Sequence, residues 1–486
     1  MKRTKRWIAF LLALLLLCGG MYTAHAEGAD TISRISCSVY GSGATGRGFC
    51  WYTEQAGGSD LDLLKTADFH GDFSGAAAYT GRANKYRGRW SHQVAVTDLA
   101  PGTAYTYRVG DRAKNLWSEP CTFVTDDGDT QVSFLAIADV QARDREEFFQ
   151  AAQTLRAGME TLPDAEFVVN LGDYVNKNTN EEWDTYFEAF AFANNTLTGV
   201  PVAGNHDGNI TDKFNTNCFK NTFCLDQSAN RSLEGIYYSF DYGNAHFAVL
   251  NTNDMYPMSQ AQKNWLINDM TQSPARWKIL LMHRSIYSAG KNINKPDTIV
   301  QRNLLLPIID RLGIDLVLSG HDHMYLRTAP MKGDRRVEDV TYVKEVFGGE
   351  ELTFAVQPQG TIYAMPATAG QKRYTVNENA IDPILPAADR LFSTRDKGGC
   401  FATVEIQDDR LVYKAYLVDD ETLEQTLVDT CAIKKPDIPA GRATHLDQSL
   451  VSTVAAWGCN LTAALVSALV SYVKLLGQVL QRAVKK

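Results

Sequence analysis

Five short segments of the sequence carry side chains that bind metal ions in many proteins, and each segment follows an apolar run. They are Ala138-Asp139-Val140-Gln141, Gly172-Asp173-Tyr174, Gly204-Asn205-His206-Asp207, Met282-His283-Arg284 and Gly320-His321-Asp322-His323. Carboxylate and amide oxygens and imidazole nitrogens are the donors with which proteins hold iron, zinc or manganese. These residue types predict metal chemistry if the fold brings the segments together.

The apolar runs predict the elements that would position these donors. Strands are expected at 132–138, 167–171, 200–203, 246–251, 277–282 and 314–318, and helices at 144–157, 181–193 and 303–312. A hairpin is expected at 401–406 and 410–417. Strands that alternate with helices predict α/β layers, and ligands in such folds bind at the carboxyl ends of the strands. The glycines in the segments permit close approach of the backbone.

Each donor also has an ordinary structural explanation when it is taken alone. An aspartate that ends a strand often caps a helix, a lone histidine is usually a core or turn residue, and Asn-His-Asp is compatible with a turn. The order of Gly-Asn-His-Asp and Gly-His-x-His, separated by His283, is hard to obtain by chance. The combination favours a metal site, whereas His70, His92, His246 and His445 are interpreted as structural or loop residues.

The region before the first donor has a different pattern. Short alternating apolar runs occur at 35–40, 48–53, 92–96, 105–109 and 121–124, separated by clusters of Gly, Pro and Asp. Such spacing predicts a small antiparallel sandwich, and residues 99–110 resemble the turn and strand found late in fibronectin type III-like domains. The acidic run 126–129 is interpreted as a linker, which gives a β domain at 31–125 and a catalytic domain at 130–435.

Both ends of the chain carry segments that these domains do not explain. A basic start, an apolar run at 7–18 and Ala24-His25-Ala26 predict a secretory signal peptide over residues 1–26. At the other end, residues 447–486 predict an amphipathic helix with uncharged residues at 451–473. A helix on a membrane surface or a partner, a spanning anchor and a helix packed on the catalytic domain all remain open. We expect an extracytoplasmic protein that is secreted or associated with the cell surface.

The composition limits the classes of partner and cofactor. The formal net charge of −8 argues against nucleic acid as the main ligand. Eight of the nine cysteines follow the signal segment, and an even number in an exported chain permits disulfides without fixing their pairing. No cysteine pair has the C-x-x-C spacing of a metal site. Metal binding therefore falls to Asp, Asn and His.

The five segments resemble the signature of calcineurin-like metallophosphoesterases. The preceding β region resembles the domain that purple acid phosphatase-like members carry before the catalytic domain, and segments 360–363 and 411–413 resemble late strands of that family. The resemblance extends from about residue 31 to 435. It implies a multidomain α+β fold, with an antiparallel β-sandwich followed by a four-layer αββα domain that holds metals at the sheet edge. The C-terminal helical tail lies beyond it.

The resemblance also implies a role for each donor. Two ions, divalent or trivalent iron, zinc or manganese, would be held by Asp139 and His323 on one side and by Asn205, His283 and His321 on the other, with Asp173 bridging both. His206 resembles the substrate-facing histidine that binds phosphate and protonates the leaving oxygen. Arg284 is expected either to contact a phosphate oxygen or to form a surface salt bridge.

Two positions depart from the family pattern. Purple enzymes carry a tyrosine ligand three residues after the bridging aspartate, where this sequence has Asn176. We therefore expect no purple colour and no obligatory ferric ion. Gln141 stands where many relatives outside the purple group have a histidine ligand. Its amide is expected to bind a metal weakly or, as we favour, to hydrogen-bond a water on the metals.

The expected reaction is hydrolysis of a small-molecule phosphate monoester. Two cations about 3.5–4 Å apart would neutralise the substrate dianion and clamp the attacking and leaving oxygens, and a hydroxide held on the metals would attack. A phosphodiesterase or nucleotidase with the same metals is the first alternative, and segments 212–234 and 332–354 would decide between them. A non-catalytic surface module is the second, and it requires a degenerate site.

Overall fold

The computed structural model describes residues 30–208, 216–226, 236–253, 258–380, 384–395 and 397–436. These residues belong to one compact unit that ends at Pro436. The predicted signal peptide (1–26) and C-terminal helix (447–486) lie outside the described residues. Within them, no helix combines the length and the apolar character needed to cross a membrane.

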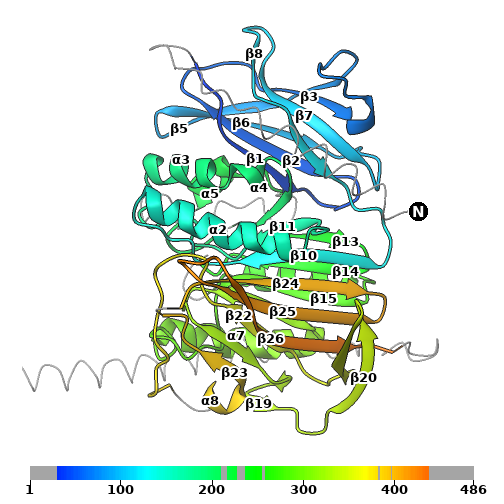
Figure 1. Cartoon of the computed structure of the whole chain (residues 1–486), viewed down its shortest axis with the longest axis vertical. Coiled ribbons are helices and arrows are strands. Elements are labelled where there is room, and N and C mark those ends of the chain that lie inside the picture. The colour runs from blue at the N-terminus through cyan, green and yellow to red at the C-terminus, as the bar shows by residue number, and fades with distance from the viewer. Residues whose placement is uncertain are drawn as a thin grey trace, which may run out of the picture. The chain divides into compact units, whose positions relative to one another are not determined.

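The first domain is an antiparallel β-sandwich, as the alternating pattern predicts (Figure 1). One sheet contains β1 (Ser33–Val39), β2 (Arg47–Thr53), β6 (Arg89–Val96) and β5 (Arg82–Tyr86). The other contains β4 (Ala77–Thr80), β3 (Asp60–Lys65), β7 (Ala104–Asp111), β8 (Leu116–Trp117) and β9 (Cys121–Val124), with a short 3-10 turn at Thr66–Asp68. Phe49, Trp51 and Tyr107 form part of the buried core between the sheets. Inward-facing apolar residues of both sheets therefore hold the sandwich together.

The second domain is built on two sheets. The first continues through β20 (Thr341–Phe347), β21 (Glu350–Val356), β26 (Gln425–Lys434), β25 (Arg410–Val418), β24 (Gly399–Gln407), β10 (Gln131–Ile137), β11 (Phe167–Asn170) and β12 (Thr198–Pro201). The second contains β13 (Tyr238–Tyr242), β14 (Ala245–Leu250), β15 (Trp277–Arg284), β16 (Leu316–Gly320), β22 (Ile362–Pro366), β17 (Tyr325–Thr328) and β23 (Ala388–Phe392). A small pair is formed by β18 (Met331–Lys332) and β19 (Arg335–Arg336).

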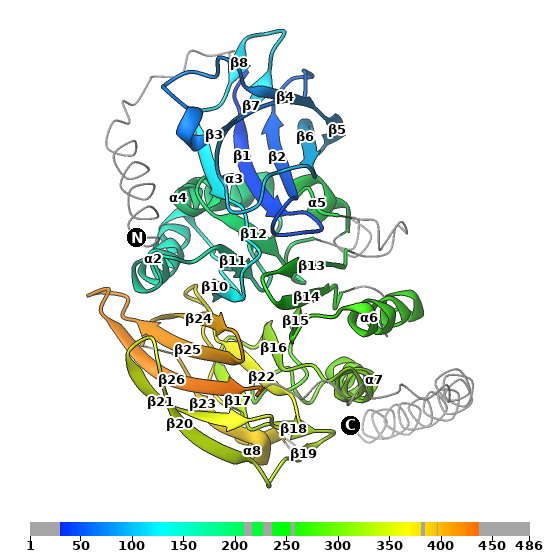
Figure 2. The same ribbon diagram turned by 90° about the vertical axis from the view of Figure 1, so that its right-hand side faces the viewer.

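Helices cover the outer faces of these two sheets (Figure 2). The helices are α2 (Arg145–Thr161), α3 (Asn180–Ala189), α4 (Ala191–Asn194), α5 (Thr216–Thr222), α6 (Gln260–Gln272), α7 (Pro296–Leu312) and α8 (Ile384–Ala387). Figure 2 shows α2 on one side of the sheets and α6 and α7 on the other. Between the sheets, the rings of Phe134 and Phe247 lie 5.6 Å apart. The second domain therefore has the αββα layers that the resemblance implies.

Local sequence signals explain where the principal helices begin and end. Asp144 caps α2 by accepting a hydrogen bond from the amide of Glu147, which satisfies a backbone donor in the first turn. Pro296 occupies the start of α7, where its fixed φ suits the helix. Gly313 ends α7 with a φ of 62°, a conformation that costs glycine little. The helix predicted at 303–312 thus begins a full two turns earlier than its apolar pattern indicated.

The two domains share a continuous hydrogen-bonded sheet, which the predicted linker did not suggest. Strand β1 pairs in parallel with β12, with Ser38 opposite Gly199. The buried guanidinium of Arg47 donates to Thr198 Oγ1 at 2.9 Å and to the carbonyl of Val124 at 2.9 Å. The strand pairing and the bond to Thr198 show that the β domain packs on the catalytic domain.

Six of the seven described cysteines are buried thiols, and Cys431 is half-buried. Burial raises the pKa of Cys37, Cys50, Cys121, Cys224 and Cys400 to about 12. Since the thiolate is the reactive form, these side chains behave as small apolar core residues. The disulfides that the even cysteine count permits are not formed among these positions.

Candidate metal centre

The five donor segments meet at one edge of the two sheets, as predicted. Strands β10, β11 and β12 run parallel to one another, and so do β15 and β16. Strands β10, β11, β12 and β16 end within four residues of a donor, and β15 carries His283 next to its last residue, so the carboxyl ends bring the segments to a common edge. The fold therefore brings the donor segments close together, as the interpretation of a metal site requires.

The backbone at this edge is strained. Positive φ angles occur at Asp139 (54°), Gln141 (38°), Asp173 (56°), His321 (79°) and His323 (43°). For residues other than glycine, such angles cost about 1–3 kcal/mol each and persist only where surrounding contacts enforce them. Enforcing bonds run from the amide of Asp139 to the carbonyl of Gly172 at 2.9 Å and from the amide of Gln141 to the carbonyl of Asp173 at 3.0 Å. Strain concentrated on the donor segments indicates a functional site.

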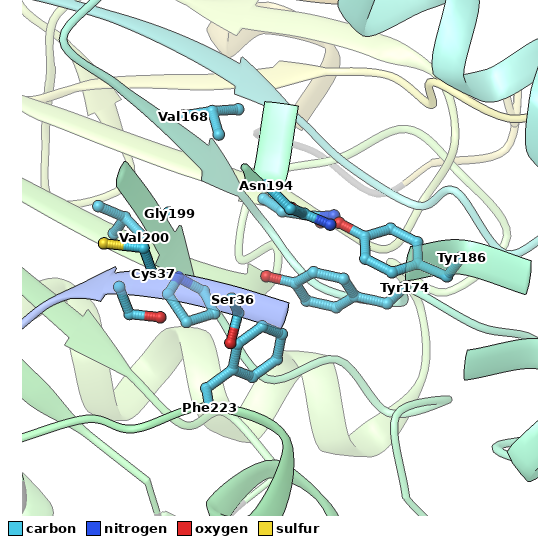
Figure 3. Close-up of a pocket in the computed structure, with 12 residues that line it drawn as sticks. Ser36, Cys37, Val168, Tyr174, Tyr186, Asn194, Gly199, Val200 and Phe223 are labelled. Atoms are coloured by element: carbon cyan, nitrogen blue, oxygen red, sulfur yellow. The ribbon is translucent and has the colours of Figure 1, made fainter. Parts of the chain in front are cut away.

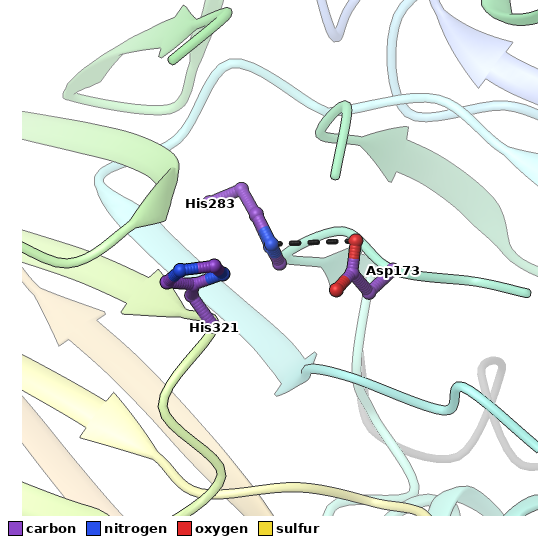
Figure 4. A group of neighbouring side chains, drawn as sticks. All are labelled: Asp173, His283 and His321. Atoms are coloured by element: carbon purple, nitrogen blue, oxygen red, sulfur yellow. Dashed lines mark ion pairs between the residues drawn. The ribbon is translucent and has the colours of Figure 1, made fainter. Parts of the chain in front are cut away.

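Two groups of donors share one carboxylate. Asp173, His283 and His321 form the first group, shown in Figure 4, and Asp139, Asp173 and His323 form the second. Within each group the ligand atoms lie within 4.8 Å of one another. Asp173 is the member common to both, in the position that the resemblance assigns to a bridging ligand.

The histidine rings are oriented by backbone carbonyls. His283 donates from Nδ1 to the carbonyl of Leu171 at 2.8 Å, and His323 Nδ1 is bonded to the carbonyl of Lys372. The opposite nitrogens therefore face the donors: His283 Nε2 lies 3.3 Å from Asp173 Oδ1, and His323 Nε2 lies 3.3 Å from Asp139 Oδ1. A carbonyl that holds Nδ1–H while Nε2 points at the ligands is the arrangement found around protein-bound metals.

Asn205 completes the donor set on the side of His283. Its Oδ1 lies 3.1 Å from His283 Nε2. The resemblance assigns Asn205 and His283 to the same ion, and in the structure these two side chains lie together.

The charges at the site fit cations. Asp139 and Asp173 are 0% and 1% exposed, and among the described residues neither carboxylate lies within ion-pair distance of a lysine or arginine. Two buried carboxylates without a permanent positive partner are costly. The oxygen and imidazole donors around them suit iron, zinc or manganese. The residues present therefore fit a pair of metal ions.

The pKa shifts follow from this crowding. Burial opposes ionisation of Asp173, but the charge of His283 lowers the pKa of the Asp173 carboxyl well below its usual value. Burial also disfavours a charged His283, yet Asp173 raises the pKa of His283 to about 9. Burial, followed by the charge of His283, lowers the pKa of His321 well below its usual value. A carboxylate and a neutral imidazole are the states that ligate metals, so the shifts of Asp173 and His321 favour ligation, whereas a charged His283 would have to lose its proton when a cation binds.

Asp207 has a role that the sequence did not reveal. Its carboxylate accepts hydrogen bonds from the amides of Asp173 (2.9 Å), Tyr174 (2.7 Å) and Gly204 (2.7 Å). Burial and then the charge of Asp173 raise the pKa of Asp207 to about 7. A Cβ at Gly204 would lie 2.0 Å from the Asp173 amide nitrogen, so only glycine fits there. Asp207 and Gly204 thus tie the two loops that carry Asp173 and Asn205.

His206 lies at the mouth of the donor set. Its amide donates to Asp173 Oδ1 at 2.7 Å, and its Nδ1 lies 2.6 Å from the carbonyl of Asn176. Because that carbonyl can only accept, Nδ1 carries the proton and Nε2 is left for other partners. The residue also lines the open cleft beside the donors. This placement is the one expected of a substrate-facing histidine.

Gln141 lies against the shared carboxylate. Its Nε2 donates to Asp173 Oδ2 at 3.0 Å, whereas its buried Oε1 has no partner among the described residues. An unpartnered buried oxygen at this place is suited to a donor from water or to a metal. Both interpretations of Gln141 stay open.

Arg284 points to other partners. Its Nε donates to Asn253 Oδ1 at 3.0 Å, and its Nη1 lies 3.5 Å from Asp297 Oδ2. The residue is absent from the described lining of the cleft. The geometry matches the salt-bridge alternative, while the charge of Arg284 contributes, after burial and the charge of His283, to the lowered pKa of His321, so the contact to phosphate stays a prediction.

The cleft beside the donors is also lined by basic residues, which the sequence pattern did not predict. Besides the donors and His206, its lining contains Lys291, Asn292, Lys295, Lys372 and Tyr374, and its volume is about 370 Å³. Tyr374 stacks on His323 with ring centroids 4.4 Å apart. The sequence carried one weak signal, since Lys291 and Lys295 follow a donor-bearing strand. All lining residues fall between 141 and 374, so no residue of the β domain lines this cleft.

A second cavity lies where β1 meets the catalytic domain (Figure 3). Tyr174, Tyr186, Asn194 and Phe223 are among the residues that line it. No charged side chain belongs to this lining. The basic cleft is therefore the candidate site for an anionic ligand, and the second cavity is not.

Comparison with known families identifies both domains. Residues 132–325 match the calcineurin-like phosphoesterase family, and residues 32–125 match the purple acid phosphatase N-terminal domain. The chain therefore contains a calcineurin-like phosphoesterase domain preceded by a purple acid phosphatase N-terminal domain.

Individual relatives agree with this assignment. Purple acid phosphatase 21 of Arabidopsis thaliana is 25% identical over 252 residues, covering 49% of this chain and 54% of that protein. Acid phosphatase type 7 of Homo sapiens is 25% identical over 303 residues, covering 57% of this chain and 64% of that protein. The matches thus span less than two thirds of these relatives.

The fold resembles a solved member of the family. The purple acid phosphatase PPD1 from yellow lupin (Lupinus luteus) seeds has a TM-score of 0.67 at 15% identity, covering 84% of this chain and 75% of that chain. At this identity the likeness concerns the fold alone. It agrees with the order observed here, a β-rich domain followed by the phosphoesterase domain.

Proposed function

We propose that the protein is an exported phosphatase that hydrolyses phosphate monoesters with two metal ions, iron, zinc or manganese. The observation that carries the proposal is the position of Asp173, whose carboxylate belongs to both donor groups. One buried carboxylate shared by two sets of ligands is suited to two cations held side by side.

When bound, such a pair of cations neutralises the phosphate charge and activates water. The chain's own residues supply the rest. Asp139 and His323 would hold one cation, Asn205, His283 and His321 would hold the other, and Asp173 would contribute to both. When both ring nitrogens carry protons, His206 presents Nε2–H to the cleft, where it would bind a phosphate oxygen and give that proton to the leaving oxygen. Gln141 steadies Asp173 and offers Oε1 to the water.

A monoester is favoured over a diester by the charge of the cleft. A monoester carries up to two negative charges, whereas a diester carries one. The lining contains three lysines in addition to the donors, so a doubly charged substrate is attracted to the cleft more strongly than a singly charged one. A phosphodiesterase or nucleotidase that uses the same donors remains the second candidate.

A non-catalytic module is the third candidate. Probable inactive purple acid phosphatase 1 of Arabidopsis thaliana is 23% identical over 269 residues, covering 49% of this chain and 44% of that protein. A loss of activity would require a damaged donor set. Here the expected donors are present and face one another, which argues for catalysis.

The test is hydrolysis by the full chain after removal of metals with a chelator. Metal-free protein is reloaded with Mn²⁺, Zn²⁺ or iron and assayed on nitrophenyl phosphate and on bis-nitrophenyl phosphate. We expect metal to restore activity, with a higher kcat/KM on the monoester. A higher kcat/KM on the diester would favour the second candidate, and metal binding without turnover on either would favour the third.

Export is part of the proposal and rests on the signal-like segment 1–26. Protein collected outside the cytoplasm is expected to begin at Glu27 when its N-terminus is sequenced. An intact N-terminus on cytoplasmic protein would contradict this location. Extraction of the protein by salt or only by detergent would decide whether residues 447–486 associate with a membrane.

A further inference from the structure

Three lysines line the same cleft as the metal donors. Lys291 and Lys295 lie in the loop before α7, and Lys372 lies in the segment after β22. We call these three residues the lysine flank. They come from loops far apart in the sequence, and the fold brings them to one cleft with His206.

The charges of the lysine flank are not neutralised within the described chain. None of its members forms an ion pair with a described carboxylate, whereas Lys344, Lys414 and Lys434 elsewhere pair with glutamates. Lys291 donates to the hydroxyl of Tyr374 at 2.8 Å and lies 4.0 Å from the centre of its ring. Both contacts position the ammonium group without cancelling its charge.

An exposed lysine is ordinarily a solvated surface residue, and a single one would carry no inference. The lysine flank differs because its members converge on a cleft whose other wall is the metal centre. In the proposed function the lysines attract a doubly charged monoester to the cleft, and two cations balance the charge of its scissile phosphate once it is bound. The three lysines can then also attract a second anionic group, because clustered positive charge raises the local concentration of anions.

We infer that the lysine flank binds a second phosphate group, so that the preferred substrates carry at least two phosphates on one small molecule. One ester is hydrolysed at the metal centre: water adds its oxygen to phosphorus, the P–O bond to the alcohol breaks, and the alcohol oxygen takes a proton. The other phosphate stays on the product and is held by the lysines. This inference rests on the proposed function and adds the substrate class.

The second phosphate has two chemical sources, a nucleotide or a sugar. The full chain, loaded with the metal that restores activity, is assayed on fructose 1,6-bisphosphate beside fructose 6-phosphate and on adenosine 3′,5′-bisphosphate beside AMP. We expect a selectivity ratio of at least about tenfold in kcat/KM for the two-phosphate member of either pair at low salt, falling as salt rises. A preference in one pair alone identifies the source.

Substitutions assign the selectivity to the lysine flank. In Lys291→Gln/Lys295→Gln the ratio is expected to fall by about tenfold, mainly through KM, because each exposed ion pair contributes modestly. Lys291→Arg retains the charge and should keep most of the ratio. Lys85→Gln, a substitution of an exposed lysine in the β domain, is the matched control and should leave it unchanged. If the double variant does not fold, Lys295→Gln alone serves, since this exposed side chain forms no hydrogen bond or ion pair with another described residue.

Binding without turnover gives an independent measurement. Calorimetry on the metal-loaded chain should give a lower Kd for inorganic pyrophosphate than for inorganic phosphate, and the double variant should narrow that difference. The inference is overturned if the kcat/KM ratio between two-phosphate and one-phosphate substrates and the Kd ratio between phosphate and pyrophosphate are both near one and do not change in the double variant. In that case, hydrolysis of nitrophenyl phosphate would still support the proposed function. Absence of hydrolysis on every substrate overturns both.

Discussion

The two walls of the cleft are built in opposite ways. The donor wall is buried, follows the ends of strands, and has nearly every side chain fixed by a hydrogen bond, as in the bond from His283 to Leu171. The lysine flank is partly exposed and comes from loops, with Tyr374 as the one described side-chain partner of Lys291. This difference indicates that residues at the ends of core strands determine the type of reaction, whereas residues of the loops, which can vary independently, determine which substrates bind.

The largest effect is expected from the residue common to both donor groups. Asp173→Asn removes the charge that two cations would share, so we expect metal content to fall from two ions per chain to less than one and kcat to fall by about 10³-fold or more. Metal analysis and a monoester assay measure both quantities. Asp62→Asn changes a buried carboxylate of the β domain that pairs with Arg108 and Arg112, and it should change neither. Full metal content in Asp173→Asn would refute the shared-ligand role.

His206→Gln is expected to separate turnover from metal binding. The backbone amide of His206 donates to Asp173, and its imidazole belongs to neither donor group. Metal content should therefore remain while kcat falls by about 10²-fold. The loss should be larger for an alkyl phosphate than for nitrophenyl phosphate, whose leaving group needs no proton. His70→Gln in the β domain is the control. A proportional loss of metal and turnover would contradict the role as proton donor.

Gln141→Ala is expected to act more weakly. Its amide supports Asp173 and leaves Oε1 for water, and changes around a metal ligand typically cost 10–100-fold, so we expect kcat to fall by about tenfold. At saturating metal the two ions should still bind. A loss of one ion would show instead that Gln141 is a ligand.

Two buried histidines outside the site should respond to pH with opposite sign. Burial lowers the pKa of His246, but bonds to Asp241 (2.7 Å) and Asp269 (2.8 Å) raise it to about 9. Its contribution to stability is present below about pH 6.5 and is lost as pH rises through about 9. His246→Gln should therefore cost about 1–2 kcal/mol in the free energy of unfolding near pH 6 and little near pH 10, discounted because Asp241 is exposed.

His92 is the matched control for that experiment. It lies between the hydroxyls of Thr53 and Ser59, and burial lowers its pKa. Because the folded state holds it neutral, its contribution is lost as pH falls below its ordinary pKa. His92→Gln should thus cost more near pH 8 than near pH 5. Denaturant unfolding across pH measures both variants, and parallel profiles would contradict the assignment.

The last prediction concerns the visible absorption of the iron-loaded protein, which we expect to be weak. Asn176 replaces the family's tyrosine ligand, and its carbonyl is engaged with His206. Tyr374 stacks face to face on His323 and accepts a bond from Lys291. The iron-loaded protein should therefore lack an intense visible band. A band that disappears in Tyr374→Phe would show that this tyrosine has taken the missing role.

The contrast between the two walls also separates what the sequence could predict from what it could not. Asp139 and His321 could be placed because a parallel strand fixes where its last residue lies. Asp207 could not be assigned, since its carboxylate bonds to an amide at Asp173 that only the folded loops bring near. Lys291 and Lys372 carry no pattern that distinguishes them from solvated lysines, and their convergence is a property of the tertiary structure.

The fold shows the same division. Strands with buried apolar runs, such as β10 and β11, were predicted within a residue or two. Strand β5 was missed because most of its residues are exposed and polar, and β20 because charged residues alternate along an edge of the sheet. The pairing of β1 with β12 joins residues 161 positions apart, Ser38 and Gly199, and no local pattern encodes it.

The most direct test of the central claim is a metal titration of the chelator-treated full chain. Bound metal and hydrolysis of nitrophenyl phosphate are measured together as Mn²⁺ or Zn²⁺ is added. We predict that activity rises with bound metal and reaches its maximum at two ions per chain. A maximum at one ion, or turnover that does not depend on metal, would contradict a site in which Asp173 is shared by two cations.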